Sequence, residues 1–158
     1  MSELSFRRAQ SRDLPAIVAM LADDALGRQR EDPAMPLDNR YLAAFDAIDA
    51  DPNQLLVVAE RAGTPVGCLQ ISFLPGLSRL GTWRGQIESV RIAADERGEG
   101  CGRQMFEWAI QQCRQRGCGL VQLTTDKSRG DVRQFYEALG FTSSHEGMKL
   151  QLDSEDGK

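Results

Sequence analysis

The chain has 158 residues, of which 41% are hydrophobic and 27% charged, a balance typical of a single soluble globular domain. Its net charge of −4 offers no basic surface for nucleic acid, and its longest apolar runs are too short to cross a bilayer. Four cysteines without a C-x-x-C pair, together with a single histidine, argue against a metal site. The N-terminus lacks the apolar core of a signal peptide, so we expect a cytoplasmic protein with reduced thiols.

The first predicted elements are a strand over residues 4–9 and a helix whose apolar positions recur at helical spacing up to residue 21. Residues 22–36 are polar and interrupted by glycine and proline, which predicts a loop or a short irregular helix. This segment is a candidate substrate lip, and its acidic side chains could attract a cationic substrate: Asp23, Asp24, Glu31 and Asp32. A solvated charged loop is the simpler interpretation of any one of them.

Asp38 is expected to cap a second helix, which ends before Pro52. Three antiparallel strands are then predicted over residues 54–60, 66–74 and 83–92, because β-branched and apolar residues alternate there between turn signals. The last of these strands leads directly into a turn that is rich in glycine.

The glycine-rich turn spans Arg97–Gly102, with the sequence RGEGCG, and opens a helix at Arg103. Unpaired N–H groups and the macrodipole at a helix N-terminus favour an anion, so the turn predicts a phosphate or pyrophosphate site. A Walker A loop is excluded because Gly102 is followed by Arg103 and Gln104 instead of lysine and a hydroxyl residue. A dinucleotide fingerprint fits poorly, since the glycines are spaced G-x-G-x-G.

The helix after the turn is predicted to end at Gly117, and a strand over residues 120–124 should return parallel to the strand before the turn. A further helical stripe around Tyr136 stops at Gly140. Residues 141–144 and 148–152 are predicted to form a final hairpin. The single domain is therefore expected to span residues 4–152, followed by a flexible tail over residues 153–158.

Two motifs in this order resemble those of the GNAT superfamily of N-acetyltransferases. They are R-x-x-G-x-G behind a V-x-I strand, at residues 90–102, and DVRQFYEALGF, at residues 131–141. The resemblance implies an α+β fold in three layers (α/β/α), with a mixed central sheet of about seven strands flanked by about four helices. The sheet would be mostly antiparallel, with one splayed parallel pair that admits the pantetheine arm of coenzyme A.

The same resemblance implies acetyl-CoA as the cosubstrate, with its pyrophosphate on backbone N–H groups of the turn and positive charge from two flanking arginines. The strand before the turn would hold the pantetheine amides and could offer an N–H to the thioester oxygen. The residues implied to bind the coenzyme are Val90, Arg91, Ile92, Arg97, Gly98, Glu99, Gly100, Cys101, Gly102 and Arg103. Cys101 is interpreted as the variable position of the turn, because a nucleophilic cysteine would need a histidine partner.

Two residues are the predicted catalytic groups. Tyr136 matches the tyrosine that in this superfamily lies near the coenzyme sulfur, where it would hydrogen-bond the departing thiolate; the alternative is a core aromatic. Glu88 is the predicted general base, because strict alternation would place it on one face with the apolar Val90 and Ile92 and partly desolvate its carboxylate. Members of the superfamily commonly have a bulge in this strand, which would break the alternation.

The sequence therefore predicts an acetyl-CoA-dependent N-acetyltransferase that works by direct attack of an amine in a ternary complex. The acceptor would be a small primary amine or an exposed amino group of a protein, and an acidic rim would suit a polyamine or a similar cation. Dimers are frequent in this superfamily, so a homodimer is one expectation. The alternative function is that of a non-catalytic acyl-CoA-binding sensor or partner module.

Overall fold

The computed structural model describes residues 3–128 and 132–153. The chain forms two compact units, with the boundary between Leu123 and Thr124, and each unit is described by itself. Asp153 alone of the predicted tail falls within the described residues, and the rest of that tail lies outside them.

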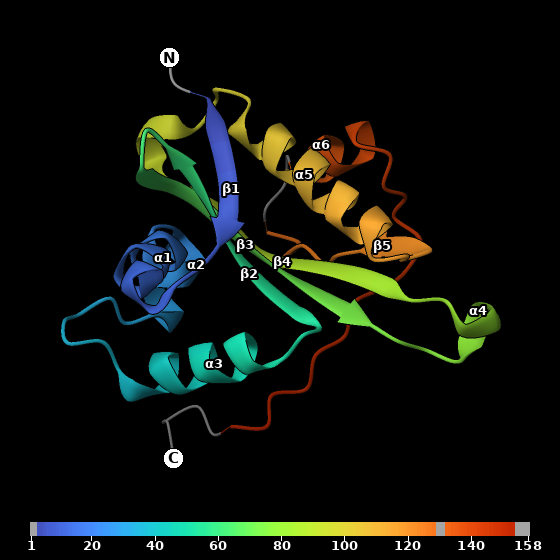
Figure 1. Ribbon diagram of the computed structural model, residues 1–158, viewed down its shortest axis with the longest axis horizontal. Coiled ribbons are helices and arrows are strands. Elements are labelled where there is room, and N and C mark those ends of the chain that lie inside the picture. Colours follow the sequence, from blue (N-terminus) through green and yellow to red (C-terminus); the bar gives the residue numbers. More distant parts are fainter. Residues whose placement is uncertain (1–2, 129–131, 154–158) are drawn as a thin grey trace. The chain divides into compact units, whose positions relative to one another are not determined.

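The first unit is built on a five-stranded sheet in the order β1-β2-β3-β4-β5 (Figure 1). Neighbouring strands are antiparallel except for the last pair, β4 and β5, which is parallel. The mostly antiparallel sheet with one parallel pair is therefore confirmed. The strands are β1 (Leu4–Arg8), β2 (Gln54–Arg61), β3 (Thr64–Leu74), β4 (Arg84–Ile92) and β5 (Leu120–Gln122).

Six α-helices lie within the described residues, α6 in the second unit and the others in the first. Asp38 caps α3 as predicted, because its carboxylate accepts the backbone N–H of Arg40 at 2.9 Å. The helices are α1 (Leu14–Ala22), α2 (Ala25–Arg30), α3 (Asn39–Ala50), α4 (Ser78–Gly81), α5 (Cys101–Gln115) and α6 (Val132–Ala138), with 3₁₀ turns at η1 (Ser11–Asp13) and η2 (Ala94–Glu96).

The predicted numbers of seven strands and four helices are wrong for the described residues. Two of the additional helices are short. Helix α2 is the short helix that was one of the two alternatives for residues 22–36, and α4 is one turn at the tip of the long β3–β4 hairpin (Figure 1). The hairpin predicted over residues 141–144 and 148–152 is also wrong, since no strand is assigned there. Met148, Leu150 and Leu152 alternate as a strand would and are largely exposed. Alternation marks a face, but a strand also needs a partner edge to complete its hydrogen bonds.

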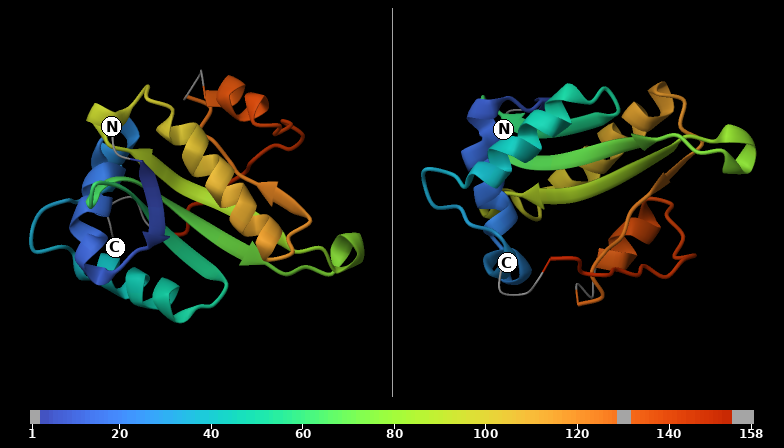
Figure 2. Two further views of the ribbon diagram at one scale, coloured as in Figure 1. Left: turned by 45° about the horizontal axis from the view of Figure 1, so that its top comes forward. Right: turned by 90° about the horizontal axis from the view of Figure 1, so that it is seen from below.

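Helices α1 and α3 cover one face of the sheet (Figure 2). Ile17 of α1 and Phe45 of α3 join Leu56 of β2 and Cys68 of β3 in one buried cluster. The helical spacing of the apolar residues in α1 accounts for this packing, because it puts them on a single side of the helix.

Helix α5 covers the opposite face of the sheet (Figure 2). Trp108 stacks on Phe6 of β1, with their ring centroids 5.1 Å apart. At the other end of α5, a Cβ added to Gly85 of β4 would overlap Sγ of the buried Cys113, so only glycine lets the helix approach the strand this closely. This packing fixes α5 beside β4 and thereby positions the turn that joins them.

Candidate functional site

The turn between β4 and α5 has the backbone conformation that its glycines suggest. Gly98 and Gly100 have φ angles of 82° and 80°, in the left-handed region that side chains disfavour. A Cβ added at either position would meet no protein atom within 4 Å, so this side of the turn is open. Gly100 is the N-cap of α5 and supplies no side-chain cap to its first N–H groups.

The N-terminus of this helix of 15 residues has no side-chain cap, and its dipole and unpaired N–H groups favour an anion there. The first turn of α5 holds Cys101, Gly102 and Arg103, whose N–H groups lie ahead of the first intrahelical bonds, and Gln104 donates to the carbonyl of Gly100 at 3.2 Å. The backbone features on which the predicted phosphate site depends are therefore present, and the site itself stays a prediction.

The two arginines of the turn have partners within the protein. Arg97 donates from Nε to the carbonyl of Ile92 at 3.1 Å, and its Nη2 lies 3.4 Å from a carboxylate oxygen of Asp23. Arg103 pairs with Glu107 one turn along α5 at 2.8 Å. Both pairs are exposed, so these arginines still contribute positive potential near the turn.

Cys101 is a packing residue of the turn. It is buried, and its Sγ lies 3.3 Å from Nη2 of Arg61 and 3.8 Å from a carboxylate oxygen of Glu96. Arg61 and Glu96 also form an ion pair at 3.0 Å. These contacts hold the end of β2 against the start of the turn, so the side chain of Cys101 is used for packing.

Strand β4 contains one residue more than its partner strand at the level of Glu88. Glu88 lies opposite Gln70, and the next regular pair is Arg91 opposite Cys68. Between these two pairs β3 advances by two residues (70 to 68) and β4 by three (88 to 91), which defines a β-bulge. Glu88 and Arg91 therefore share the sheet face of Gln70 and Cys68, which is the face covered by α1 and α3.

The prediction that Glu88, Val90 and Ile92 lie on one face is wrong for this reason. Ser89 absorbs the extra residue with a φ angle of 56°, which is uncommon outside glycine. Glu88 is exposed, whereas Val90 and Ile92 are half-buried, so the expected desolvation of Glu88 by these neighbours is also wrong. The bulge instead interrupts the pairing of β4 with β3 at Ser89, which lines a pocket together with residues of α1.

The corner between α1 and α2 is fastened to β4 and to the turn by two ion pairs. Asp23 faces Arg97, and Asp24 Oδ2 lies 3.7 Å from Nε of Arg91. Asp24 also caps α2 by accepting the N–H of Gly27 at 2.5 Å. Nε of Arg91 is buried without a hydrogen-bond partner in the described part of the chain. Two of the acidic side chains predicted to attract a cationic substrate are therefore paired with arginines.

A pocket of about 160 Å³ lies beside the bulge, between α1, α3 and strands β2, β3 and β4. Its walls are mostly aliphatic and aromatic, including Ile17, Phe45 and Leu56. Gln70 and Ser89 line it at the sheet, and none of the described residues lining it is charged. The pocket is therefore a mostly apolar space with two polar groups at the sheet, one from β3 and one from the bulged part of β4.

Tyr41 forms part of the pocket wall and fixes the loop before α3. Its hydroxyl donates to a carboxylate oxygen of Glu31 at 2.8 Å and accepts the backbone N–H of Asp32 at 2.9 Å. Burial is the main cause that raises the pKa of Tyr41, so the hydroxyl stays protonated at neutral pH. Glu31 is thereby a third acidic side chain of the predicted lip with an internal partner.

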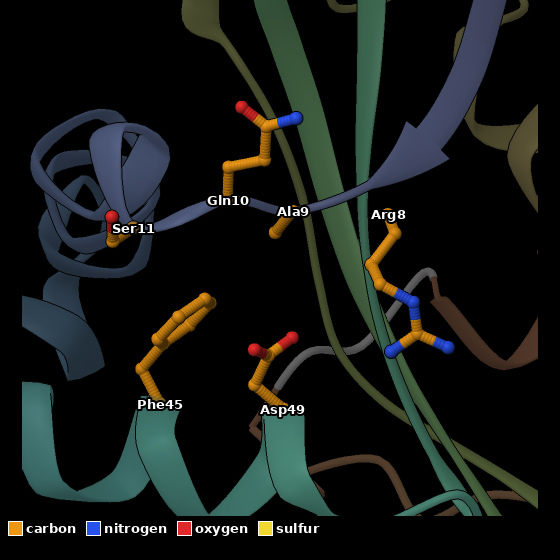
Figure 3. A pocket seen from close by; sticks show the side chains of 6 residues that line it. All are labelled: Arg8, Ala9, Gln10, Ser11, Phe45 and Asp49. Carbon is orange, nitrogen blue, oxygen red and sulfur yellow. The ribbon is translucent and has the colours of Figure 1, made fainter.

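A second hollow, of about 280 Å³, lies between the loop after β1 and α3 (Figure 3). Phe45 and Asp49, one turn apart on α3, point toward the loop of Gln10 and Ser11, and Arg8 extends from the end of β1. The lining of this hollow is mixed, and it includes no residue of β4 or of the glycine-rich turn. Its lining residues belong to the end of β1, the loop after β1 and α3, so none of them is among the residues predicted to bind the coenzyme.

Tyr136 lies in α6, which belongs to the second unit. Its ring makes edge-to-face contacts with Phe135 and Phe141, at centroid distances of 5.5 and 6.0 Å. The helix ends at Ala138, and the predicted stop at Gly140 follows in a turn, with a φ angle of 102°. The role of Tyr136 at the coenzyme sulfur stays a prediction.

Sequence reasoning missed the residues that form the pocket. Ser89 is part of a strand pattern and gives no signal of a positive φ, and Gln70 and Tyr41 belong to elements that precede the motif. The described residues contain no cluster of three or more side chains suited to a metal ion. Nor does any helix in the described part of the chain have the length and apolarity needed to span a membrane.

Comparisons with known proteins agree with this geometry. The sequence profile of the acetyltransferase (GNAT) family matches residues 17–141. An aminoalkylphosphonate N-acetyltransferase of Salmonella typhimurium is 33% identical over 101 residues, which cover 64% of this chain and 65% of that protein. An L-methionine sulfoximine/L-methionine sulfone acetyltransferase of Pseudomonas paraeruginosa is 29% identical over 98% of this chain and 88% of its own length.

Solved structures show the same fold. A protein described as a transcriptional regulator from Bacillus halodurans C-125 is 47% identical and has a TM-score of 0.92, over 95% of this chain and 100% of that one. AAC(6′)-Iy, solved with a bisubstrate analog that contains CoA, has a TM-score of 0.75 at 16% identity, over 97% of this chain and 100% of that one. The chain therefore belongs to the acetyltransferase (GNAT) family.

Proposed function

We propose that this protein is an acetyl-CoA-dependent N-acetyltransferase that acetylates a primary amine of a small molecule by direct attack in a ternary complex. The observation that carries the proposal is the open, uncapped N-terminus of α5, with its two left-handed glycines, directly behind the bulged strand β4. Such a backbone favours a pyrophosphate. The proposal is also supported by the relatives, since one that matches 64% of the chain is named an N-acetyltransferase and one that matches 98% is named an acetyltransferase.

The reaction needs a neutral amine, because an alkylammonium with a pKa of about 10.4 has no lone pair at neutral pH. Glu88 is exposed next to the bulge and lies opposite Gln70, which lines the pocket. In the proposed reaction its carboxylate accepts the ammonium proton through water. The amine nitrogen then attacks the thioester carbonyl, and a backbone N–H of β4 stabilises the resulting oxyanion.

Collapse of the tetrahedral intermediate breaks the C–S bond and releases the thiolate of coenzyme A. The proposed role of Tyr136 is to donate a hydrogen bond to this sulfur while its negative charge develops. A tyrosine with a pKa of about 10 would transfer its proton to a thiolate of pKa about 8.5 only late, since full transfer is uphill by about 2 kcal/mol. The ammonium loses two protons in all. The first leaves through Glu88, and the second, lost as the amide forms, equals the proton that the thiolate gains.

The direct test is release of coenzyme A from acetyl-CoA with a panel of primary amines. The wild-type protein should turn over at least one amine, and Tyr136→Phe should lower kcat about tenfold with little change in KM, because a hydrogen bond to a charged group contributes about 1.5–3 kcal/mol. Phe135→Leu, a change of the neighbouring aromatic, serves as the control for packing. Normal kcat in Tyr136→Phe would remove the tyrosine from the mechanism.

Glu88→Gln should lower kcat/KM about tenfold at neutral pH, and the deficit should shrink as the pH approaches the pKa of the amine itself. The reason is that a free amine no longer needs a base, so only a proton-accepting role predicts this recovery. Asp46→Asn, which removes an exposed carboxylate on α3, is the control for a general change in surface charge. A deficit that is constant across pH would indicate that Glu88 positions the substrate instead.

The second candidate function is that of an acyl-CoA-binding regulatory module. It is favoured by one observation, the description of the similar Bacillus halodurans structure as a transcriptional regulator. The amine assay separates the two functions. A protein that binds acetyl-CoA but turns over no amine, with Tyr136→Phe behaving like the wild type, would support the regulatory module.

A further inference from the structure

The pocket beside the bulge has the size of a small hydrocarbon. Its volume is about 160 Å³, and apolar protein cavities of about 150 Å³ can hold a molecule the size of benzene. Sites for drug-sized ligands are larger, at about 300–1,000 Å³. The space therefore suits a side chain of a few carbon atoms.

The walls of the pocket do not provide a partner for a charge. Three of its polar lining groups, Tyr41, Gln70 and Ser89, are neutral, and no described lining residue is ionic. Gln70 donates from Nε2 to Oε1 of Gln54 at 2.9 Å, which fixes its amide at the sheet. An ammonium or carboxylate inside this space would lose its hydration without gaining a counter-ion.

The acidic residues near the pocket are occupied by partners of their own. Asp23 faces Arg97, Asp24 faces Arg91, and Glu31 accepts the hydroxyl of Tyr41. Each of these three carboxylates therefore has a partner within the protein. They are less available to a cationic substrate than the composition of residues 22–36 suggests.

We infer that the acceptor is a primary amine with a small uncharged apolar substituent, which fills the pocket while the amino group lies at the Ser89 end next to Glu88. This inference rests on the proposed function. This orientation of the amine follows from the lining, because most apolar lining residues come from α1 and α3, whereas two of the three polar groups, Gln70 and Ser89, lie on the sheet at the bulge. The inferred acceptor therefore differs from polyamines and lysine-like cations, which carry a second charge.

The first test compares n-alkylamines from ethylamine to hexylamine with diamines of the same length. We expect kcat/KM to rise about fourfold with each added methylene until the pocket is full, since burying one CH₂ is worth about 0.8 kcal/mol. Butylamine should exceed diaminobutane by at least about tenfold. Equal or better rates with the diamine, or no dependence on chain length, would overturn the inference.

The second test makes the pocket smaller by enlarging a side chain of α3 that lines it. Ala44 lines it, whereas the exposed Ala47, on the same helix, does not. Ala44→Leu should raise KM for butylamine about tenfold and leave KM for ethylamine unchanged, and the control Ala47→Leu should change neither. If both variants behave alike, the alkyl chain binds elsewhere.

Binding of butylamine to the protein without coenzyme provides a readout that is independent of catalysis. Backbone amide shifts in α1 and α3 should move with butylamine in the wild type and move much less in Ala44→Leu. Such shifts without any turnover would refute the proposed function while supporting the pocket assignment. Turnover of amines without shifts in α1 and α3 would retain the enzyme and refute the pocket.

Discussion

The Gly100→Val variant is expected to bind acetyl-CoA about a hundredfold more weakly than the wild type. Gly100 has a φ angle of 80° at the N-cap of α5, where valine costs about 1–2 kcal/mol or more. Its side chain would also occupy the open side of the turn, where the proposed pyrophosphate approaches the helix N-terminus. The backbone strain lowers the stability of the free and bound forms alike, so we expect the loss of affinity, roughly 2.7 kcal/mol for a hundredfold change, to come from this blocked approach. Isothermal titration calorimetry with acetyl-CoA measures it.

Gly117 offers a matched control at the other end of the same helix. Its φ angle is 81°, and an added Cβ there would also meet no protein atom within 4 Å. Gly117→Val should therefore lose a similar amount of thermal stability and keep its affinity for acetyl-CoA. Equal affinity losses in both variants would mean that strain in α5 explains the effect and that the turn holds no coenzyme.

This turn was predictable from sequence because its cause is local. Arg97–Gly102 contains three glycines within six residues, and a left-handed backbone at a helix start requires residues of this kind. The cap at Asp38 and the helix end at Gly117 were predictable for the same reason. Each depends on a backbone conformation that one residue type favours strongly.

The bulge and the pocket were not predictable in the same way. Ser89 adopts a positive φ because β3 and β4 pair with different numbers of residues, which is a property of two strands and not of either one. The pairing of Asp23 with Arg97 joins residues that are 74 positions apart. Acidic composition alone suggested a cationic substrate, whereas in the folded chain Asp23, Asp24 and Glu31 each have a partner within the protein.

The strand content of residues 141–152 was overestimated for a related reason. Alternating apolar residues predict which side chains share a face, but the pattern carries no information about the edge that would accept the backbone hydrogen bonds. Strand β5 illustrates the requirement, because only its three residues Leu120–Gln122 pair with β4. Whether such a segment joins a sheet therefore depends on a neighbouring strand that pairs with it and on the length of that pairing, and not on alternation alone.

The Asp13→Asn variant is expected to lose about 3 kcal/mol of unfolding free energy at neutral pH. Asp13 is buried and receives two bonds from the guanidinium of Arg7, at 2.7 and 2.8 Å, and a third from the N–H of Gln10 at 2.7 Å. Arg7 also pairs with Glu60 at 3.1 Å, so the cluster joins β1, β2 and the start of α1. An asparagine would place its own NH₂ group against the N–H donors of Arg7, and it would remove the negative charge that pairs with the guanidinium. A loss of this size is typical of breaking a buried ion pair. Urea denaturation measures it.

The pH dependence of this loss identifies its electrostatic origin. The hydrogen bonds from Arg7 hold the pKa of Asp13 below its ordinary value, against the opposing effect of burial. A carboxyl with a lowered pKa stabilises the fold fully above its unfolded-state pKa of about 3.9, and this contribution is lost as the pH falls through the lowered value. The difference between wild type and Asp13→Asn should therefore shrink in acid below about pH 4.

Asp38→Asn is the control that separates burial from pairing. The hydrogen bond from Arg40 lowers the pKa of Asp38 to about 2, yet the pair is exposed to solvent, where screening leaves little net stabilisation. Asparagine is also an effective N-cap, so α3 keeps its start and the variant should unfold like the wild type at every pH. If Asp38→Asn were as damaging as Asp13→Asn, or if the Asp13→Asn difference persisted unchanged in acid, the stabilisation would come from local backbone geometry and not from a buried charge pair.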